Sequence, residues 1–329
     1  MEYFKGKHIL LIMPVFFGYE IEVAVALRKT GALVDWMPDR PFKSTLLKVV
    51  ARTSPRLITW WADILYKNAL NDFSVSKYDY IFVINGQTLS SRTLRLLKNK
   101  YPAASYILYM WDSVANRKNI KNNFQFYDKI FTFDPYDAKK FGLFFRPLFY
   151  CDGFNKLSSR RDFAYHLSFV GTAHSDRYQI INRLRCKLPS YVKSYLYLYL
   201  QSKAVYWLSK LLRPGMLTAR KSEFNFSPLG KKDVESIFSN SFAILDIEHP
   251  NQTGLTIRSF ETMGSCKKLV TTNTAIRDYD FFSQNNICII DRNNPTIPEN
   301  FFHTPYLQLP ELIRNRYSIN GWLREIFED

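Results

Sequence analysis

The chain has 329 residues, of which 47% are hydrophobic and 16% aromatic, and its formal net charge is +16. This length and composition predict a globular protein of two domains, and without an apolar run of about 18 residues no transmembrane helix is expected. The positive charge favours phosphorylated ligands, an anionic membrane or nucleic acid as partners, but no helix-turn-helix, RNP or zinc-finger signature supports nucleic acid.

The first residues, MEYFKGKHILLIMPVFF, are basic and then apolar, as in a signal peptide, but they lack a small-residue cleavage site. We interpret them as the first core strand of a cytoplasmic protein. The four cysteines are widely scattered, with no CxxC or Cys/His spacing, which predicts reduced thiols and no zinc site.

The first half of the chain predicts alternating strands and helices, as in a parallel α/β domain. Strands are expected at residues 8–14, 33–37, 78–85, 105–111, 127–133 and 144–150, and helices at 20–29, 43–72, 90–100 and 135–141. In the helix at 20–29 we expect Ile21, Val25 and Leu27 to face the core. The opening β-α-β unit lacks a GxGxxG sequence, so a dinucleotide cofactor is not expected.

Two acidic residues of this half follow predicted strands, at the edge where open α/β sheets bind ligands. Asp112 comes directly after the strand at 105–111, where an aspartate could act as a general base or could cap the following turn. Glu20 begins the first helix, where a carboxylate is favoured for structural reasons, and an active-site role is the alternative.

A polar, charged stretch at 152–163 is predicted to link this half to a second α/β series. Its strands are expected at 165–170, 242–247, 268–272 and 286–291, and helical segments at 176–187, 231–239 and 310–327. After the first of these strands, Gly171 and Thr172 could offer backbone N–H groups to a phosphate. Ser175 could take part in phosphate binding with this loop, or it could be only a helix N-cap. His174 could be a surface histidine.

Basic residues concentrate at 156–232, and at 190–213 they interleave with aromatic and aliphatic residues. This segment predicts helices with a basic, aromatic-rich surface, which suits peripheral contact with an anionic membrane. A buried pair of helices whose lysines extend to solvent is the alternative.

Residues 249–261, HPNQTGLTIRSFE, lie between two predicted strands and indicate a strand, turn, helix, strand unit. Such a unit presents the N–H groups of a helix start to a ligand. Arg258 and Glu261 are three residues apart on the predicted helix and share a face. The N–H groups and the guanidinium suit a diphosphate, and the carboxylate suits the hydroxyls of a ribose. A solvated Arg–Glu pair on an ordinary helix is the alternative.

Taken in order, these stretches resemble the GT-B glycosyltransferases, and more specifically the CgeB-like and the capsule or lipopolysaccharide biosynthesis glycosyltransferases. The resemblance spans most of the chain and rests on FFGYE at 16–20, DRP at 39–41, YMWDS at 109–113, RPLFY at 146–150, SFVGTAHSDR at 168–177 and HPNQTGLTIRSFETMGSCKKLVTTN at 249–273. It implies two Rossmann-like domains facing across a cleft. Residues 1–152 would hold the acceptor and residues 153–309 the nucleotide-sugar donor, with a terminal helix at 310–329 packing back on the first domain.

By this resemblance the leaving diphosphate is stabilised by helix dipoles and basic side chains, without a metal or a cofactor. The nucleotide sugar is a substrate, and a UDP-sugar is the first expectation. The residues expected to bind it are Gly171, Thr172, Ser175, Arg177, Thr253, Gly254, Leu255, Thr256, Arg258 and Glu261.

One departure from the pattern concerns Thr253. Retaining GT-B enzymes with an E-x7-E motif carry an acid eight positions before the ribose-binding glutamate, and Thr253 stands there in this chain. An inverting mechanism or a different retaining arrangement is left open. For inversion, Asp112 is the first candidate for the base that deprotonates the acceptor, and Glu20 is the second.

The sequence thus predicts a hexosyltransferase-type enzyme of cell-surface glycan synthesis, located in the cytoplasm and peripherally at the inner face of the plasma membrane. Its acceptor would be a saccharide, either free or lipid-linked. The competing interpretation is a non-catalytic nucleotide-binding or nucleic-acid-binding protein that uses the same basic surface.

Overall fold

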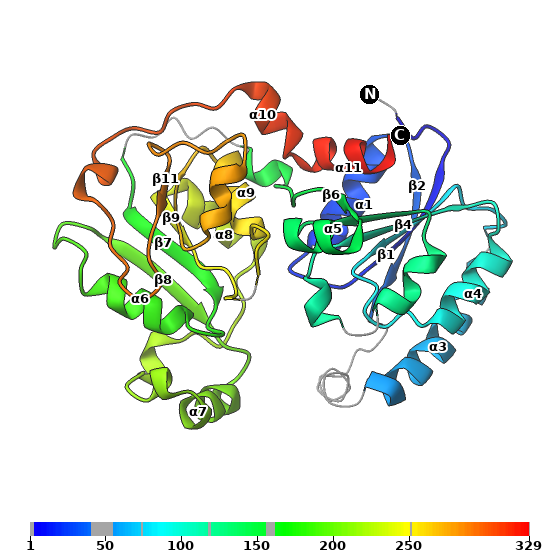
Figure 1. The fold of residues 1–329 in the computed structure, drawn as a ribbon, viewed down its shortest axis with the longest axis horizontal. Coiled ribbons are helices and arrows are strands. Elements are labelled where there is room, and N and C mark those ends of the chain that lie inside the picture. Colours follow the sequence, from blue (N-terminus) through cyan, green and yellow to red (C-terminus); the bar gives the residue numbers. More distant parts are fainter. Residues whose placement is uncertain are drawn as a thin grey trace. The chain divides into compact units, whose positions relative to one another are not determined.

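The computed structural model describes residues 3–40, 55–73, 75–117, 120–155, 162–250 and 252–328, and of residues 55–58 the backbone alone. The contacts divide the chain into two compact units, shown in Figure 1. Unit 1 comprises Met1–Pro147 and Leu323–Asp329, and unit 2 comprises Leu148–Trp322. The division falls before the polar stretch at 152–163, of which residues 156–161 lie outside the described part.

Unit 1 is built on a six-stranded sheet whose paired strands are all parallel, in the order β2-β1-β3-β4-β5-β6. The strands are β1 (His8–Met13), β2 (Leu33–Pro38), β3 (Tyr80–Ile84), β4 (Ser105–Met110), β5 (Lys129–Thr132) and β6 (Phe144–Phe145). The helices are α1 (Tyr19–Lys29), α3 (Pro55–Asp72), α4 (Ser91–Lys100) and α5 (Pro135–Phe141), and α3 and α4 lie side by side on one face (Figure 1). Of the predicted helix at 43–72, residues 43–54 lie outside the described part.

The continuous apolar runs of this sheet are buried on both faces, as parallel strands require. All residues from Ile9 to Met13 have no exposed surface. In α1, by contrast, Ile21 and Val25 are 63% and 38% exposed, so the prediction that they face the core was wrong. The prediction for Leu27 is confirmed, because the helix buries it together with Val23, which lies four residues earlier on the same face.

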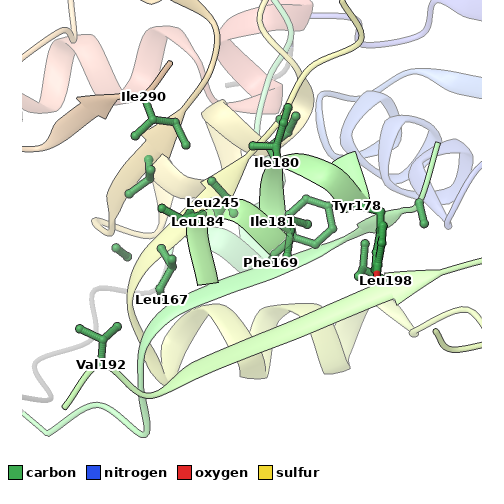
Figure 2. Close-up of a cluster of buried hydrophobic side chains, with 14 of the residues drawn as sticks. Leu167, Phe169, Tyr178, Ile180, Ile181, Leu184, Val192, Leu198, Leu245 and Ile290 are labelled. Carbon is green, nitrogen blue, oxygen red and sulfur yellow. The ribbon is translucent and has the colours of Figure 1, made fainter. Parts of the chain in front are cut away.

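Unit 2 contains a five-stranded sheet in the order β11-β10-β9-β7-β8, again with every pair parallel. Its strands are β7 (Tyr165–Thr172), β8 (Ser194–Tyr199), β9 (Ser241–Asp246), β10 (Lys268–Thr271) and β11 (Ile287–Ile289). Its helices are α6 (Arg177–Arg185), α7 (Lys203–Leu212), α8 (Lys231–Ser239), α9 (Ile257–Gly264) and α10 (Glu311–Arg316). Figure 2 shows the core between α6 and the sheet, where Ile181 and Leu184 meet Leu167, Phe169 and Leu245.

The predicted helix at the start of the 190–213 segment was wrong, because Ser194–Tyr199 is the edge strand β8. Its sequence, SYLYLY, alternates two residue types with period two, the spacing of a strand. It pairs with β7 over six residues, from Leu167 opposite Ser194 to Thr172 opposite Tyr199. The helical prediction holds only for the later part of the segment, which forms α7.

The chain ends in α11 (Ile319–Phe327), which begins in unit 2 and ends in unit 1. In unit 1 the ring of Phe327 packs edge-on against Phe4, Tyr80 and Phe82, with centroid distances of 4.9, 5.1 and 5.1 Å. The two parallel sheets covered by helices confirm the predicted α/β class with two Rossmann-like domains. No helix in the described part of the chain is long and apolar enough to span a bilayer.

Candidate functional site

In unit 2, the buried carboxylate of Asp246 at the carboxyl end of β9 fixes the start of α9. Asp246 is 2% exposed. Its Oδ2 accepts hydrogen bonds from Thr256 Oγ1 at 2.7 Å and Ser259 Oγ at 2.8 Å. Thr256 is the N-cap of the helix, and its Oγ1 accepts from the backbone N–H of Arg258 at 3.1 Å. The helix N-terminus, where an anion is favoured, is therefore anchored directly to the sheet.

We expect replacement of Asp246 by alanine to destabilise unit 2, because the buried hydroxyl of Ser259 and the partly buried hydroxyl of Thr256 would lose a charged acceptor. The expected loss is about 2–3 kcal/mol of unfolding free energy, measured by urea denaturation. Asp246→Asn keeps one acceptor oxygen and should lose less unfolding free energy than Asp246→Ala. Asp291→Ala, in an exposed loop where the carboxylate accepts from two backbone N–H groups, is the matched control. Equal losses for Asp246→Ala and the control would contradict this account.

Side-chain amide groups hold the turn before α9 by donating hydrogen bonds to its backbone carbonyl groups. Asn273 Nδ2 donates to the carbonyls of Thr253 at 3.2 Å and Gly254 at 3.4 Å. Gln252 Nε2 also donates to the Gly254 carbonyl at 2.8 Å, and the Leu255 side chain is buried at 1% exposure. These bonds turn the carbonyls toward Asn273 and fix the backbone of the segment that was predicted to meet a phosphate.

Arg258 and Glu261 form a close ion pair on α9. Arg258 Nη1 lies 2.5 Å from Glu261 Oε2, and the guanidinium also stacks over the Phe238 ring, 5.4 Å from its centroid. The Glu261 side chain is 1% exposed, whereas that of Arg258 is 24% exposed. Arg258 is therefore the member of the pair that reaches solvent.

The loop after β7 differs from the predicted turn, because Gly171 and Thr172 are the last residues of the strand. A Cβ at Gly171 would lie 2.9 Å from the Phe169 ring and 3.2 Å from Arg177 Nη1. Glycine here leaves room for Arg177, whose Nη1 donates to the Thr172 carbonyl at 3.1 Å and whose Nε donates to the Ile247 carbonyl at 2.7 Å. Arg177 thus joins the carboxyl ends of β7 and β9.

Ser175 lies in this loop with a positive φ of 48°, which a side-chain-bearing residue rarely adopts. Its Oγ is 2.8 Å from His174 Nδ1. The residue preceding the first turn of α6 is Asp176, without a side-chain cap. The alternative interpretation of Ser175 as an N-cap was therefore wrong, and the residue orients His174.

A charged network that was not predicted from the sequence lies at the same edge of the sheet. Arg292, which follows β11, lies 3.0 Å from Asp176 and donates to the Glu248 carbonyl at 2.9 Å. It also pairs with the Glu248 carboxylate, which accepts from Thr272 Oγ1 at 2.5 Å. Glu248 follows β9 and Arg292 follows β11 by three residues, so their place after predicted strands was the signal that could have found them.

Arg258 and Arg292 both lie within electrostatic reach of Arg177. Burial lowers the pKa of Arg177, and the positive charges of Arg258 and Arg292 lower it further, while Asp246 and Glu248 act in the opposite direction. Burial also raises the pKa of Glu248. Three guanidinium groups close to a helix N-terminus form a suitable environment for an anionic ligand.

His174 is neutral in this environment. Burial, followed by the charge of Arg177, lowers its pKa to about 3. Because the folded pKa is below the unfolded value of about 6.5, the unfolded chain binds a proton first, and stability falls as the pH drops from about 6.5 toward 3. We expect the ¹⁵N shifts of His174 to show no titration between about pH 8 and pH 5. A midpoint near 6.5 would contradict this arrangement.

In unit 1, Asp112 follows β4 with its side chain 30% exposed. Its carboxylate accepts from Arg117 Nη2 at 2.6 Å and from Asn116 Nδ2 at 2.9 Å. Asn85, which follows β3, accepts from the same Arg117 nitrogen at 2.9 Å and from Trp111 Nε1 at 3.3 Å in the amide orientation that satisfies both groups. The ends of β3 and β4 are thus joined, and Asp112 faces solvent at the edge where it was predicted.

Glu20 is more buried, at 8% exposure. Its Oε2 accepts from the backbone N–H of Phe16 at 3.0 Å and closes a turn in which Phe17 and Gly18 have positive φ values. The Phe16 ring lies 5.6 Å from that of Trp111, so the turn before α1, which Glu20 closes, and the loop carrying Asp112 are neighbours. Of the two alternatives for Glu20, this geometry favours the structural one.

Among the residues that the structure describes, no group of three or more histidine, cysteine, aspartate or glutamate side chains is placed to hold a metal ion. The predicted site residues form two sets, one in each unit. Unit 2 brings together the ends of β7 and β9 and the start of α9, and unit 1 carries Asp112 and Glu20.

Solved structures with a similar fold are known. No family model and no curated protein matches the sequence. Among solved structures, the chain is similar to Anabaena HepE in complex with UDP-glucose, with 10% identity, a TM-score of 0.61 and 98% coverage of both chains. HepE in complex with UDP and glucose gives 11% identity, a TM-score of 0.52, and coverage of 98% of this chain and 95% of that one.

A glycosyltransferase from Rickettsia africae ESF-5 is similar along its whole length as well. The identity is 12%, the TM-score is 0.54, and 98% of this chain and 97% of that chain are covered. At these identities the comparisons establish the fold alone, which these structures share with the chain over nearly its whole length.

Proposed function

We propose that this protein is a glycosyltransferase that moves a sugar from a nucleotide-diphosphate donor to a growing cell-surface glycan of the capsule, O-antigen or lipopolysaccharide type. The observation that carries the proposal is the anchored N-terminus of α9 beside Arg258, with Arg177 and Arg292 within electrostatic reach. The similarity to a structure in complex with UDP-glucose supports a UDP-sugar as the donor.

In the proposed reaction, the bond between the sugar C1 and the diphosphate oxygen breaks as an acceptor hydroxyl attacks C1. The N–H groups of Gly254, Leu255 and Thr256 and the guanidinium of Arg258 stabilise the charge on the departing diphosphate, without a metal. Glu261 binds the ribose hydroxyls, which requires its carboxylate to become accessible when the nucleotide enters.

The proposed base is in unit 1. Asp112 would accept the proton of the acceptor hydroxyl, and the sugar would be transferred with inversion. Its partly exposed carboxylate at the carboxyl edge of the sheet supports this role. Glu20 would position the turn beside it. In this proposal residues 1–152 hold the saccharide acceptor, which is lipid-linked, and residues 153–309 bind the donor, with the protein working at the inner face of the plasma membrane.

A thermal-shift panel of UDP, GDP, CMP, CDP and dTDP tests the donor site. We expect UDP to raise the melting temperature of the full chain, and Arg258→Ala to abolish the shift. If another nucleotide raised the melting temperature and UDP did not, the donor would be a sugar carried by that nucleotide. If none of the five shifted the melting temperature and oligonucleotides bound in a gel-shift assay, the nucleic-acid alternative would replace the enzyme.

A further inference from the structure

Unit 2 carries an apolar helix face outside the site described above. Helix α7 projects from the margin of the unit beyond β8 (Figure 1). Five large apolar side chains of α7 and the turn after it are exposed: Trp207 (61%), Leu208 (56%), Leu211 (80%), Leu212 (67%) and Leu217 (59%). The four on the helix lie at positions i, i+1, i+4 and i+5, which form one continuous face. Apolar side chains gathered in this way mark an interaction surface.

The opposite side of α7 is attached to the body of the unit. Tyr206 is 2% exposed, its hydroxyl donates to the Ala219 carbonyl at 2.9 Å, and its ring lies 5.5 Å from that of Phe224. Ser202 caps the helix by accepting from the Val205 N–H at 3.2 Å. The apolar face is therefore presented by a helix that is already anchored, and a partner need not order it.

The charged residues of the segment that carries this face are all positive. Residues 202–222 contain no aspartate or glutamate, and their cations are Lys203, Lys210, Arg213, Arg220 and Lys221. Lys210 donates to the Ala219 carbonyl at 3.2 Å, which holds it at the border between the buried side and the exposed face. The first acid after the segment, Glu223, accepts from Tyr178 and from the Arg220 N–H.

We propose that α7 and the turn to Lys221 form a docking site for an anionic phospholipid membrane, independent of the reaction at α9. Trp207 and the leucines enter the boundary between headgroups and acyl chains, and the cations meet the lipid phosphates. A second copy of this chain is a poorer occupant, because a two-fold interface would bring the cations of one copy against those of the other.

Vesicle co-sedimentation of the full chain tests the proposal, with pure phosphatidylcholine vesicles and with mixed phosphatidylcholine–phosphatidylglycerol vesicles. We expect binding to the mixed vesicles that weakens as salt is added. The triple variant Leu208→Ser, Leu211→Ser, Leu212→Ser should lower the partition coefficient at least about tenfold, because three exposed apolar side chains no longer enter the membrane. Leu312→Ser is the matched control, since Leu312 is 81% exposed on α10, and it should bind as the parent does.

Tryptophan fluorescence tests whether α7 is the part of the chain that contacts the vesicle. Mixed vesicles should shift the tryptophan emission of the parent chain to the blue, and Trp207→Phe should remove most of that shift. The proposal is overturned if the parent does not bind mixed vesicles or if the triple-serine variant binds as well as the parent. It is also overturned if the triple variant changes only a monomer–dimer equilibrium in sedimentation, which would make the face a contact between copies.

Discussion

Replacement of Arg258 by alanine is expected to lower kcat/KM for the nucleotide sugar by about 100-fold or more, the typical effect of removing one donor that stabilises developing negative charge. Arg258 is the partly exposed cation at the anchored start of α9. Steady-state kinetics with the nucleotide sugar identified by the thermal-shift panel measures the effect.

The Arg258→Ala variant needs a folding control, because it leaves the buried carboxylate of Glu261 without this cation. Breaking a buried pair on one side costs about 3–5 kcal/mol. The double variant Arg258→Gln, Glu261→Gln replaces the ion pair with a neutral hydrogen-bonding pair and should retain more stability while staying inactive. Arg185→Ala removes a cation from an exposed position of the same unit, 54% exposed, and should keep its activity within about twofold. Sugar transfer that survived the double variant would refute the proposed roles of Arg258 and Glu261 in binding the nucleotide.

Asp112→Asn is expected to lower kcat by about 100- to 10,000-fold, the range that a positioned general base contributes. The asparagine keeps one of the two acceptor oxygens, so it can retain the bond from Arg117 or the bond from Asn116, and the loop should lose only part of its support. The thermal shift produced by the nucleotide should not change, because the donor residues belong to unit 2. Single-turnover measurements of sugar transfer, with nucleotide binding measured in parallel, separate these two quantities.

The matched control is Asp128→Asn. Asp128 precedes β5, at the amino end of the strand, where it pairs with Lys98 at 3.4 Å with its side chain 51% exposed. Loss of this pair should leave kcat unchanged, since exposed ion pairs contribute little. If Asp112→Asn lowered the melting temperature but transferred sugar at the parent rate, Asp112 would be an anchor for Arg117 and the base would have to be sought elsewhere.

Local signals predicted much of the fold. Helix α5 has the predicted limits, because Asp134 caps it by accepting from Tyr136, Pro135 begins it and Gly142 ends it with a φ of 64°. The buried strands could be predicted because continuous apolar runs suit parallel sheets. Strand β8 was missed because its tyrosines and leucines were assigned to a helix although they alternate with period two.

The candidate site was less predictable, because it depends on contacts between distant parts of the chain. The turn at 252–256 and the Arg258–Glu261 pair are local and were found from their spacing. The need for glycine at 171 depends on Arg177 and the Phe169 ring, which meet it only in the folded sheet. Arg292 and Glu248 each follow a predicted strand, but they are 44 residues apart in sequence, so no local pattern reveals that they pair.

The path of α11 has a consequence for biosynthesis. Phe327 completes a cluster with Phe4, Tyr80 and Phe82, so we expect unit 1 to complete its core only after unit 2 has been synthesised. Unit 2, synthesised in between, has its own sheet and core and can fold earlier. Nascent chains stalled before Phe327 should therefore be cleaved by protease in unit 1 sooner than in unit 2. Equal protection of both units would show that the terminal helix is dispensable for folding.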